Sequence, residues 1–236
     1  MTTSDGPAYG PAYGIIVAAG RSERMTGVDK IFAQVMGRPL LAWTLGAFKK
    51  CEAIEGVVVV AAPESVSKMH AFVQEWRFTN VSAVVPGGAT RQESVRAGLE
   101  ATDGAAIVAV HDAARLMVTP ELIAQGVLLA REHGAAICGA PSRDTVKEID
   151  GDPPVVRATP DRSRVWIAQT PQVFRRELLL RAHAAASDNA TDDAALVEAL
   201  GEPVVAYEGP QWNLKVTEPD DLVIAEALLR ERFASV

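Results

Sequence analysis

The chain is poor in the residues that mark disulfide-rich and zinc-binding proteins. Two cysteines, Cys51 and Cys138, occur among its 236 residues, in apolar surroundings and without paired spacing. We therefore expect buried, reduced thiols in a cytoplasmic protein, which argues against a disulfide framework. The four histidines do not have the spacing of zinc ligands, so a zinc site is not expected either.

The chain also lacks an excess of positive charge and any long apolar run. Its formal net charge is −7, so general affinity for nucleic acid or an anionic membrane is not expected, and any anion must be bound by a local cluster of cations. No apolar run reaches the ~20 residues that a membrane-spanning helix needs. We expect no secretory signal, because the start of the sequence lacks a basic region followed by an apolar one.

After a short repetitive start, apolar segments alternate with segments of helical spacing. Residues 1–13 contain the repeat PAYGPAYG and are expected to form a disordered tail. The expected strands are short and apolar: Gly14–Ala18, Val57–Ala61, Val81–Val85, Ala105–Val110, Ala135–Ala140 and Val204–Tyr207. The expected helices have helical spacing or a capped start: Pro39–Cys51, Glu64–Trp76, helices beginning at Thr90 and Thr119, Arg175–Ala186, Asp192–Leu200 and a last helix beginning near Thr217. This alternation predicts an α/β fold with a mostly parallel sheet, helices on both faces, and ligands beyond the carboxyl ends of the strands.

The pattern changes between residues 141 and 172. Helical spacing is absent there, and prolines interrupt two extended segments, Thr145–Ile149 and Val155–Ala158. Such an insertion has too little core to fold alone. We therefore expect it to pack on another surface, such as a second subunit.

The first expected strand runs into small residues and then into cations. Ala18-Ala19-Gly20 would let backbone N–H groups approach a ligand, and Arg24 and Lys30 could bind phosphate. A surface loop with solvated charges is an equally good interpretation of this stretch alone. It is neither a Walker loop, since no Gly-Lys-Ser/Thr follows, nor a dinucleotide fingerprint, since Ser22 replaces the second glycine.

Three more polar segments follow later strands. Pro86–Ser94 joins glycines to a capped helix start and could bind an anion or a base, although an ordinary tight turn is the better interpretation in isolation. Asp112 ends a buried strand, where it could hold Mg²⁺ or simply pair with Arg115. Lys215 lies between apolar residues and is a weak candidate by itself.

Together these segments resemble the 2-C-methyl-D-erythritol 4-phosphate cytidylyltransferases of the non-mevalonate isoprenoid pathway, from Gly14 to about Arg230. The motifs that carry the resemblance occur in the family's order: AAGRSERM with the later Lys30, GGATRQESV, VHDAAR, RDTVK, DRSRVWIAQTPQ, TDDA and KVT. The first motif alone would indicate only a nucleotidyltransferase with a Rossmann-like fold. VHDAAR with TPQ and KVT narrows this to cytidylyl transfer onto a polyol phosphate. The sequence departs from the family's pattern at Val17, Ser22, Leu116 and Trp212.

The resemblance implies a Rossmann-like, mostly parallel sheet in a single nucleotidyltransferase domain, residues 14–236. An extended β-arm insertion at about 141–165 would interlock a homodimer. The implied reaction transfers CMP from CTP to 2-C-methyl-D-erythritol 4-phosphate, with Mg²⁺ and release of pyrophosphate. Two alternatives stay open: a ribitol 5-phosphate cytidylyltransferase, which shares nearly all of these motifs, and a non-catalytic nucleotide-binding regulatory protein. Intact Arg24, Lys30, Asp112 and Lys215 argue against the second.

The resemblance also implies roles for individual residues. The implied catalytic residues are four cations, of which Arg162 would act from the partner subunit: Arg24, Lys30, Arg162 and Lys215. Asp112 would hold the metal. The implied substrate-binding residues are Ala18, Ala19, Gly20, Gly88, Arg91, Ser94, Asp112, Arg115, Thr145, Thr170, Thr191 and Thr217. The nucleophile would be an ionised phosphate oxygen, so positioning and positive charge would supply most of the catalysis without a side-chain base.

Overall fold

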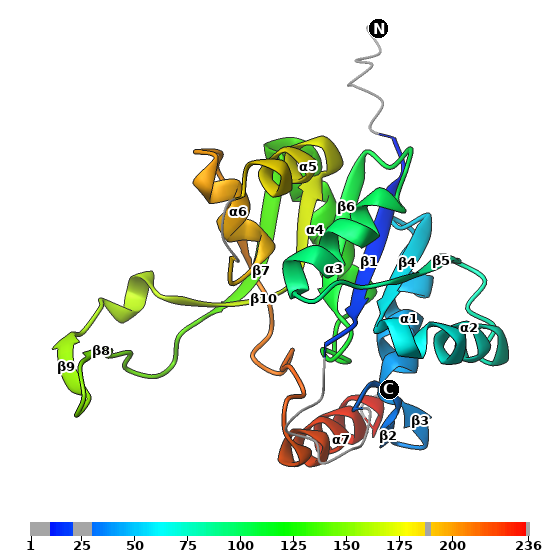
Figure 1. Cartoon of the computed structure of the whole chain (residues 1–236). Coiled ribbons are helices and arrows are strands. Elements are labelled where there is room, and N and C mark those ends of the chain that lie inside the picture. Colours follow the sequence, from blue (N-terminus) through cyan, green and yellow to red (C-terminus); the bar gives the residue numbers. More distant parts are fainter. Residues whose placement is uncertain (1–9, 21–29, 187–189, 235–236) are drawn as a thin grey trace, which may run out of the picture.

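The fold is built on a seven-stranded sheet with the strand order β11-β7-β10-β6-β1-β4-β5 (Figure 1). The computed structural model describes residues 10–20, 30–186 and 190–234. The sheet strands are β1 (Ala12–Ala18), β4 (Gly56–Ala61), β5 (Val81–Pro86), β6 (Ile107–Asp112), β7 (Ala135–Pro141), β10 (Trp166–Arg175) and β11 (Val205–Glu208). All of them run parallel except β10, which is antiparallel to both of its neighbours. The expected mostly parallel α/β sheet is confirmed.

Helices cover both faces of the sheet because successive strand residues point to opposite sides. Along β4, Val57 and Val59 join one buried apolar cluster, and Val58 and Val60 join the other. The first cluster is covered by α1 (Leu40–Lys50), α2 (Val66–Glu75) and α4 (Pro120–His133), and the second by α3 (Arg91–Glu100), α5 (Arg176–Ala185) and α6 (Asp193–Ala199).

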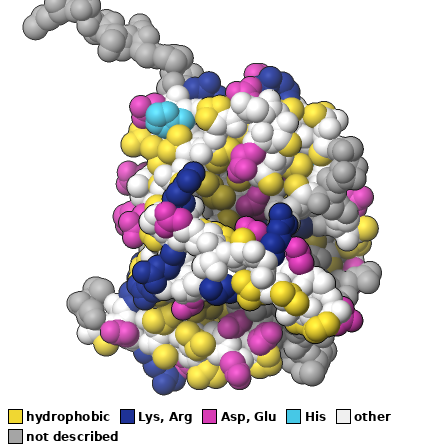
Figure 2. Space-filling model, turned by 90° about the vertical axis from the view of Figure 1, so that its left-hand side faces the viewer, with side chains coloured by type: hydrophobic (Ala, Val, Ile, Leu, Met, Phe, Trp, Pro, Cys, Tyr) yellow, Lys and Arg dark blue, Asp and Glu magenta, His cyan; other side chains and the backbone are white. Residues whose placement is uncertain are grey.

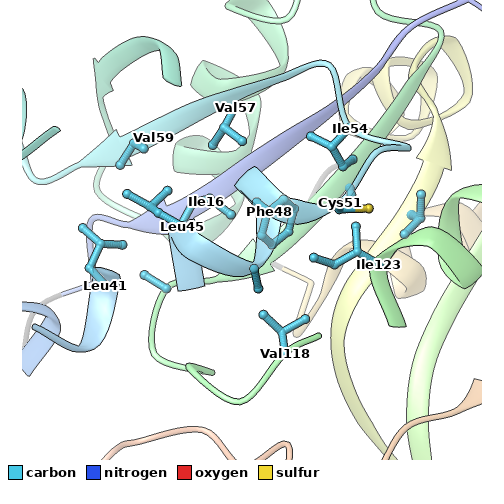
Figure 3. Close-up of a cluster of buried hydrophobic side chains, with 14 of the residues drawn as sticks. Ile16, Leu41, Leu45, Phe48, Cys51, Ile54, Val57, Val59, Val118 and Ile123 are labelled. Atoms are coloured by element: carbon cyan, nitrogen blue, oxygen red, sulfur yellow. The ribbon is translucent and has the colours of Figure 1, made fainter. Parts of the chain in front are cut away.

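Helix α1 shows how sequence spacing becomes packing. Leu41, Leu45 and Phe48 recur at helical spacing and lie on one face, against Ile16 of β1 and Val57 of β4 (Figure 3). All five side chains are fully buried. Burial of an aliphatic or aromatic side chain of this size stabilises a fold by about 1.5–3 kcal/mol. This packing holds the central strands in place, so their carboxyl ends form a fixed edge.

A smaller apolar cluster attaches the C-terminal helix α7 (Pro219–Ala234) near that edge. It joins Leu229 of α7 to Val35 of the short strand β2 (Gln34–Val35), which pairs with β3 (Arg38–Pro39). Met117 and Val216 belong to the same cluster. The segment around Val216 is thereby brought beside the turn that follows β6. None of the described helices has both the length and the apolar character to cross a membrane.

Most expected elements are present, with ends shifted by one or two residues. Both hydrogen bonds of the capping box at Thr90 are made, and Thr119 caps α4. The expected tail was too long, because β1 already begins at Ala12, which is 1% exposed and pairs with Ile107 of β6. Residues 1–9 lie outside the described residues.

Strand β10 is the main element that the sequence did not reveal. It lies between β6 and β7, but Pro171 inside it suggested an interruption. The pairing with β7 shifts register between Ala168 and Gln172, so the proline sits in an irregular stretch of the ladder. A residue without an N–H is tolerated at such a place.

Residues 142–165 leave the body between β7 and β10 and extend away from it (Figure 1). Near their tip, β8 (Glu148–Asp150) and β9 (Val155–Ala158) form a two-stranded antiparallel hairpin, and η3 (Arg162–Arg164) follows. Their side chains are almost all exposed. Figure 2 looks onto the side of the molecule toward which this segment extends, and it shows charged side chains of both signs among hydrophobic ones. We call residues 142–165 the arm.

Candidate active site

A cavity of about 870 Å³ lies at the edge where β1, β4, β5 and β6 end. Two of its lining residues are glycines in tightly packed positions. A Cβ atom on Gly87 would collide with Ala19, and one on Gly88 would collide with Glu93. The Gly88 N–H donates to Oγ of Ser94 at 3.2 Å, which fixes this loop against the start of α3. Both loops line the cavity, and at Gly87 and Gly88 the packing leaves no room for a side chain.

Asp112, the last residue of β6, carries the negative charge around which the cations of this site are arranged. Its Oδ2 lies 2.9 Å from Nζ of Lys215 and 3.8 Å from Nε of Arg115, and its Oδ1 lies 3.4 Å from Nε of Arg91. Burial alone would raise the pKa of Asp112, but Lys215 and Arg91 outweigh it and hold the pKa well below the ordinary value. One ionised carboxylate is thus surrounded by three cations, which suits an anionic ligand.

Arg91 is held on its other side by Asp193. Its NH1 lies 2.7 Å from Oδ2 of Asp193, a carboxylate 1% exposed whose Oδ1 lies 3.3 Å from Nε2 of His183. Burial would lower the pKa of Arg91, but the Asp193 and Asp112 carboxylates outweigh it and raise the pKa. Arg91 therefore stays charged, and its two carboxylate partners hold its side chain in one orientation. Asp193 was not among the expected site residues. It lies in the TDDA motif, but the motif does not indicate that this carboxylate pairs with a residue of α3.

The loop that carries Lys215 is anchored through Asn213. This fully buried amide donates from Nδ2 to Oε1 of Gln169 and to the carbonyl of Thr170, both at 3.0 Å. Its own carbonyl accepts a hydrogen bond from NH1 of Arg115 at 2.9 Å. These bonds tie the loop to β10 and to the turn after β6, so Lys215 is held beside Asp112.

Thr170 and His111 lie beneath the site. Thr170 is 3% exposed, and its Oγ1 accepts a hydrogen bond from the backbone N–H of Asp112 at 3.1 Å. His111 is fully buried, and this burial lowers the pKa of its ring to about 4, despite the opposing charge of Asp112. The imidazole is therefore neutral at pH 7.

The structure brings most of the expected site residues together. Those that line the cavity are Ala18, Ala19, Gly20, Lys30, Gly88, Arg91, Ser94, Asp112, Lys215 and Thr217. Arg115 and Thr170 adjoin it through their contacts with Asp112. Arg24 lies outside the described residues.

Three expected site residues do not line this cavity. Thr145 and Arg162 are exposed on the arm, where NH1 of Arg162 donates to the carbonyl of Arg143 at 3.0 Å. Thr191 is exposed just before Asp192, which caps α6. Within one chain, the cavity is thus assembled without the arm.

Trp212 lies apart from this cavity as well. It lines a second cavity of about 850 Å³, between the start of α4 and helix α7. The guanidinium of Arg232 stands 5.5 Å from the centre of its ring. The departure from the family's pattern at Trp212 therefore does not alter the lining of the first cavity.

The donor set around Asp112 fits one kind of metal ion. Among the described residues, no group of three or more histidine, cysteine or acidic side chains is placed to hold a metal. Mg²⁺, however, is commonly bound by one or two carboxylates, with waters and substrate phosphates completing its shell. The described part of the site therefore fits Mg²⁺ that is shared with bound phosphates, and its described side chains are too few to hold the ion alone.

Known proteins resemble the chain over nearly its whole length. The family model described as "IspD: 2-C-methyl-D-erythritol 4-phosphate cytidylyltransferase" matches residues 13–231. The protein of that name from Dehalococcoides mccartyi (strain CBDB1) is 42% identical over 217 residues, covering 92% of this chain and 95% of its own. The one from Geobacillus kaustophilus (strain HTA426) is 41% identical, covering 93% and 97%.

Solved structures agree with the sequence matches. The 2-C-methyl-D-erythritol 4-phosphate cytidylyltransferase from Thermus thermophilus superposes with a TM-score of 0.75 at 37% identity, covering 92% of this chain and 98% of the other. The 4-diphosphocytidyl-2C-methyl-D-erythritol synthase from Anaerococcus prevotii DSM 20548 superposes with a TM-score of 0.82 at 29% identity, covering 94% and 99%. The resemblance seen in the motifs thus extends to the whole fold, and the chain belongs to the 2-C-methyl-D-erythritol 4-phosphate cytidylyltransferase family.

Proposed function

We propose that the protein transfers CMP from CTP to 2-C-methyl-D-erythritol 4-phosphate, giving 4-diphosphocytidyl-2-C-methyl-D-erythritol and pyrophosphate. One observation carries the proposal: an ionised, buried Asp112 is surrounded by Lys215, Arg91 and Arg115 at the edge of a cavity of about 870 Å³. This arrangement supports a function in which two anionic substrates must be brought together.

The chemistry needs charge and position more than a proton acceptor. A phosphate-monoester oxygen of the acceptor attacks the α-phosphorus of CTP, and the bond from that phosphorus to the β-bridging oxygen breaks. Lys30 and Lys215 line the cavity and can stabilise the charge that develops on the phosphates. The loops at Gly20 and Gly88 would take the cytosine and ribose. Arg24 has its part in this proposal from the family motif.

Mg²⁺ belongs to the proposal as a cofactor of the nucleotide-bound state. Asp112 would hold it, and when bound the ion would neutralise phosphate charge. Lys215, which pairs with Asp112 here at 2.9 Å, could then turn to a phosphate oxygen. We place the enzyme in the cytoplasm, in keeping with its two free, buried cysteines.

We also propose a homodimer in which the arm of one subunit reaches the site of the other. The support is the arm's exposed apolar side chains: Ile149, Val155 and Val156 are 49%, 61% and 54% exposed. A monomer leaves such a cluster in water, and a two-fold dimer is the commonest way to cover it. Arg162 and Thr145 would then contact the acceptor phosphate and polyol of the partner's site, and Thr191 would adjoin them.

Mixing two inactive variants tests the shared site. Arg162→Ala and Lys30→Ala subunits, allowed to exchange, should regain activity because each heterodimer contains one intact site. Arg157→Ala is the matched control on the arm, since the Arg157 side chain is 67% exposed and its ion pair with Asp150 is long, at 3.7 Å. Demonstrated subunit exchange without regained activity would reject the shared site, and a monomer in sedimentation at assay concentration would reject the dimer.

A comparison of acceptors tests the reaction itself. Pyrophosphate release from CTP should be fast with 2-C-methyl-D-erythritol 4-phosphate and at least tenfold slower, in kcat/KM, with ribitol 5-phosphate, a difference of about 1.4 kcal/mol. A preference for ribitol 5-phosphate would reassign the acceptor. No release with either acceptor, at measurable CTP binding, would favour a nucleotide-binding regulatory protein.

A further inference from the structure

His111 has no part in the proposed transfer of CMP, yet it is a polar side chain buried inside the central sheet. It is fully buried in β6, next to Asp112, and its ring stacks at a tilt against Phe48 with the ring centres 5.4 Å apart. The other residues of β6 before Asp112 are apolar. A buried polar side chain is destabilising unless its hydrogen bonds are satisfied, so its partners indicate what it does.

Each ring nitrogen of His111 has a hydrogen-bond partner next to Asp112. Nδ1 lies 2.9 Å from Oγ1 of Thr170, and Nε2 lies 3.1 Å from the carbonyl oxygen of Arg115. The carbonyl can only accept, so Nε2 must carry the proton and Nδ1 must accept. The hydroxyl of Thr170 is free to donate to Nδ1, because its oxygen already accepts from the N–H of Asp112. A single neutral tautomer satisfies every group.

This chain of bonds holds the turn that carries the site's charges. Thr170 fixes the amide of Asp112 from the neighbouring strand β10, and His111 fixes the carbonyl of Arg115 at the end of the turn. The Arg115 N–H closes the turn by donating to the carbonyl of Asp112 at 3.0 Å. We call Thr170, His111 and these bonds the His111–Thr170 bracket. Neither side chain reaches the cavity, since Thr170 is 3% exposed and His111 is fully buried.

We propose that His111 and Thr170 are positioning residues, which set the backbone of Asp112 and Arg115 and so hold both charged side chains in place for the transfer of CMP. Thr170 thus acts through Asp112, and it does not contact the acceptor as the family motif suggested. The inference rests on the proposed function, because it assigns a role within that same reaction.

Kinetics of isosteric variants test the role. Thr170→Val keeps the shape but removes the hydroxyl, and kcat should fall by about 10- to 100-fold with either KM changed less than about threefold. Thr170→Ser should restore most of the rate. His111→Gln keeps a donor near Nε2 but loses the acceptor at Nδ1, so it should cause a similar loss. Because both variants break the same bond, the double variant should be no slower than the worse single variant.

Three kinetic results would overturn the proposal. A raised KM for the polyol phosphate with normal kcat in Thr170→Val would mean that Thr170 contacts substrate. Independent, multiplying effects in the double variant would mean that no bracket exists. Lower thermal stability with normal kcat per folded molecule would mean a purely structural role. If Thr170→Val does not fold, His111→Gln and Thr170→Ser carry the same comparison.

A spectroscopic readout separates this inference from the proposed function. Long-range ¹⁵N–¹H correlation of the histidine rings in the full-length protein reads the tautomer of His111 without any turnover. The bracket requires a proton on Nε2 and an unprotonated Nδ1 at pH 7, and Thr170→Val should shift both the Nδ1 resonance and the Asp112 amide. An Nδ1–H tautomer overturns the bracket even if the enzyme is active. An inactive wild type would reject the proposed function, and with it the catalytic role of the bracket.

Discussion

Replacing Asp112 with asparagine should separate nucleotide binding from catalysis, because it removes a charge and keeps the shape of the side chain. In the wild type the carboxylate offsets part of the charge of Lys215, Arg91 and Arg115. In the variant those three cations face an uncharged amide. The triphosphate of CTP then meets a more positive site, whereas the group that would hold Mg²⁺ and orient Lys215 is lost.

The size of the binding effect follows from the geometry. Two unit charges about 4 Å apart interact by ~4 kcal/mol at an effective dielectric of about 20. Lys215 and Arg91 are 39% and 28% exposed, so solvent screens much of this attraction. We expect the Kd for CTP without metal to fall roughly tenfold, about 1.4 kcal/mol. We expect kcat to fall ~10²–10³-fold, as is common when one preorganised electrostatic contact is lost.

Calorimetric titration of CTP in the presence of a chelator measures the Kd, and pyrophosphate release at saturating substrates measures kcat. Glu100→Gln is the matched control for net charge, since Glu100 is 71% exposed on α3 and its ion pair with Arg96 spans 4.0 Å. It should change neither quantity. Weaker CTP binding in Asp112→Asn, together with an unchanged kcat, would show that the Asp112 charge neither opposes the triphosphate nor serves catalysis.

Three further outcomes follow from the site. Lys30→Ala should lower kcat ~10²–10³-fold with the fold intact, whereas Lys50→Ala, an exposed lysine of α1, should not; equal rates would remove Lys30 from the mechanism. Asp193→Asn should raise the KM for CTP roughly tenfold because Arg91 loses its buried anchor at 2.7 Å, and an unchanged KM in steady-state kinetics would show that Arg91 is held without it. Burial lowers the pKa of His111 to about 4 from its ordinary 6.5. Between these two pH values the unfolded chain binds a proton on His111 that the folded chain does not bind. The free energy of unfolding should therefore be highest above pH 6.5 and fall by roughly 2–3 kcal/mol toward pH 4. Urea unfolding should show this slope in the wild type and a smaller one in His111→Gln, and equal slopes would contradict the assignment.

Much of the fold follows from local sequence signals. The valines of β4 and the spacing of Leu41, Leu45 and Phe48 need only the periodicities of strand and helix. The same signals fail for β10, because Pro171 is a strong local argument against a central strand. Its tolerance depends on the register shift beside it, which is a property of strand pairing and not of the segment itself.

Some residues of the candidate site could likewise be expected from the sequence, and others could not. Lys30, Asp112 and Lys215 follow strands or lie in family motifs, so their convergence could be expected from the topology of a parallel sheet. Asp193 and His111 could not be assigned, since their partners lie on other elements. Arg91 and Asp193 are 102 positions apart in sequence. The direction in which a buried polar side chain points therefore cannot be inferred from the sequence around it.

The proposed reaction can be followed directly by ³¹P NMR of the purified protein with CTP, Mg²⁺ and 2-C-methyl-D-erythritol 4-phosphate. If the protein catalyses this transfer, the acceptor's monoester signal should disappear as a diphosphate diester and free pyrophosphate appear in equal amounts. No pyrophosphate should appear when the acceptor is left out. Pyrophosphate without the diester, or CTP left intact beside the acceptor, would contradict the claim.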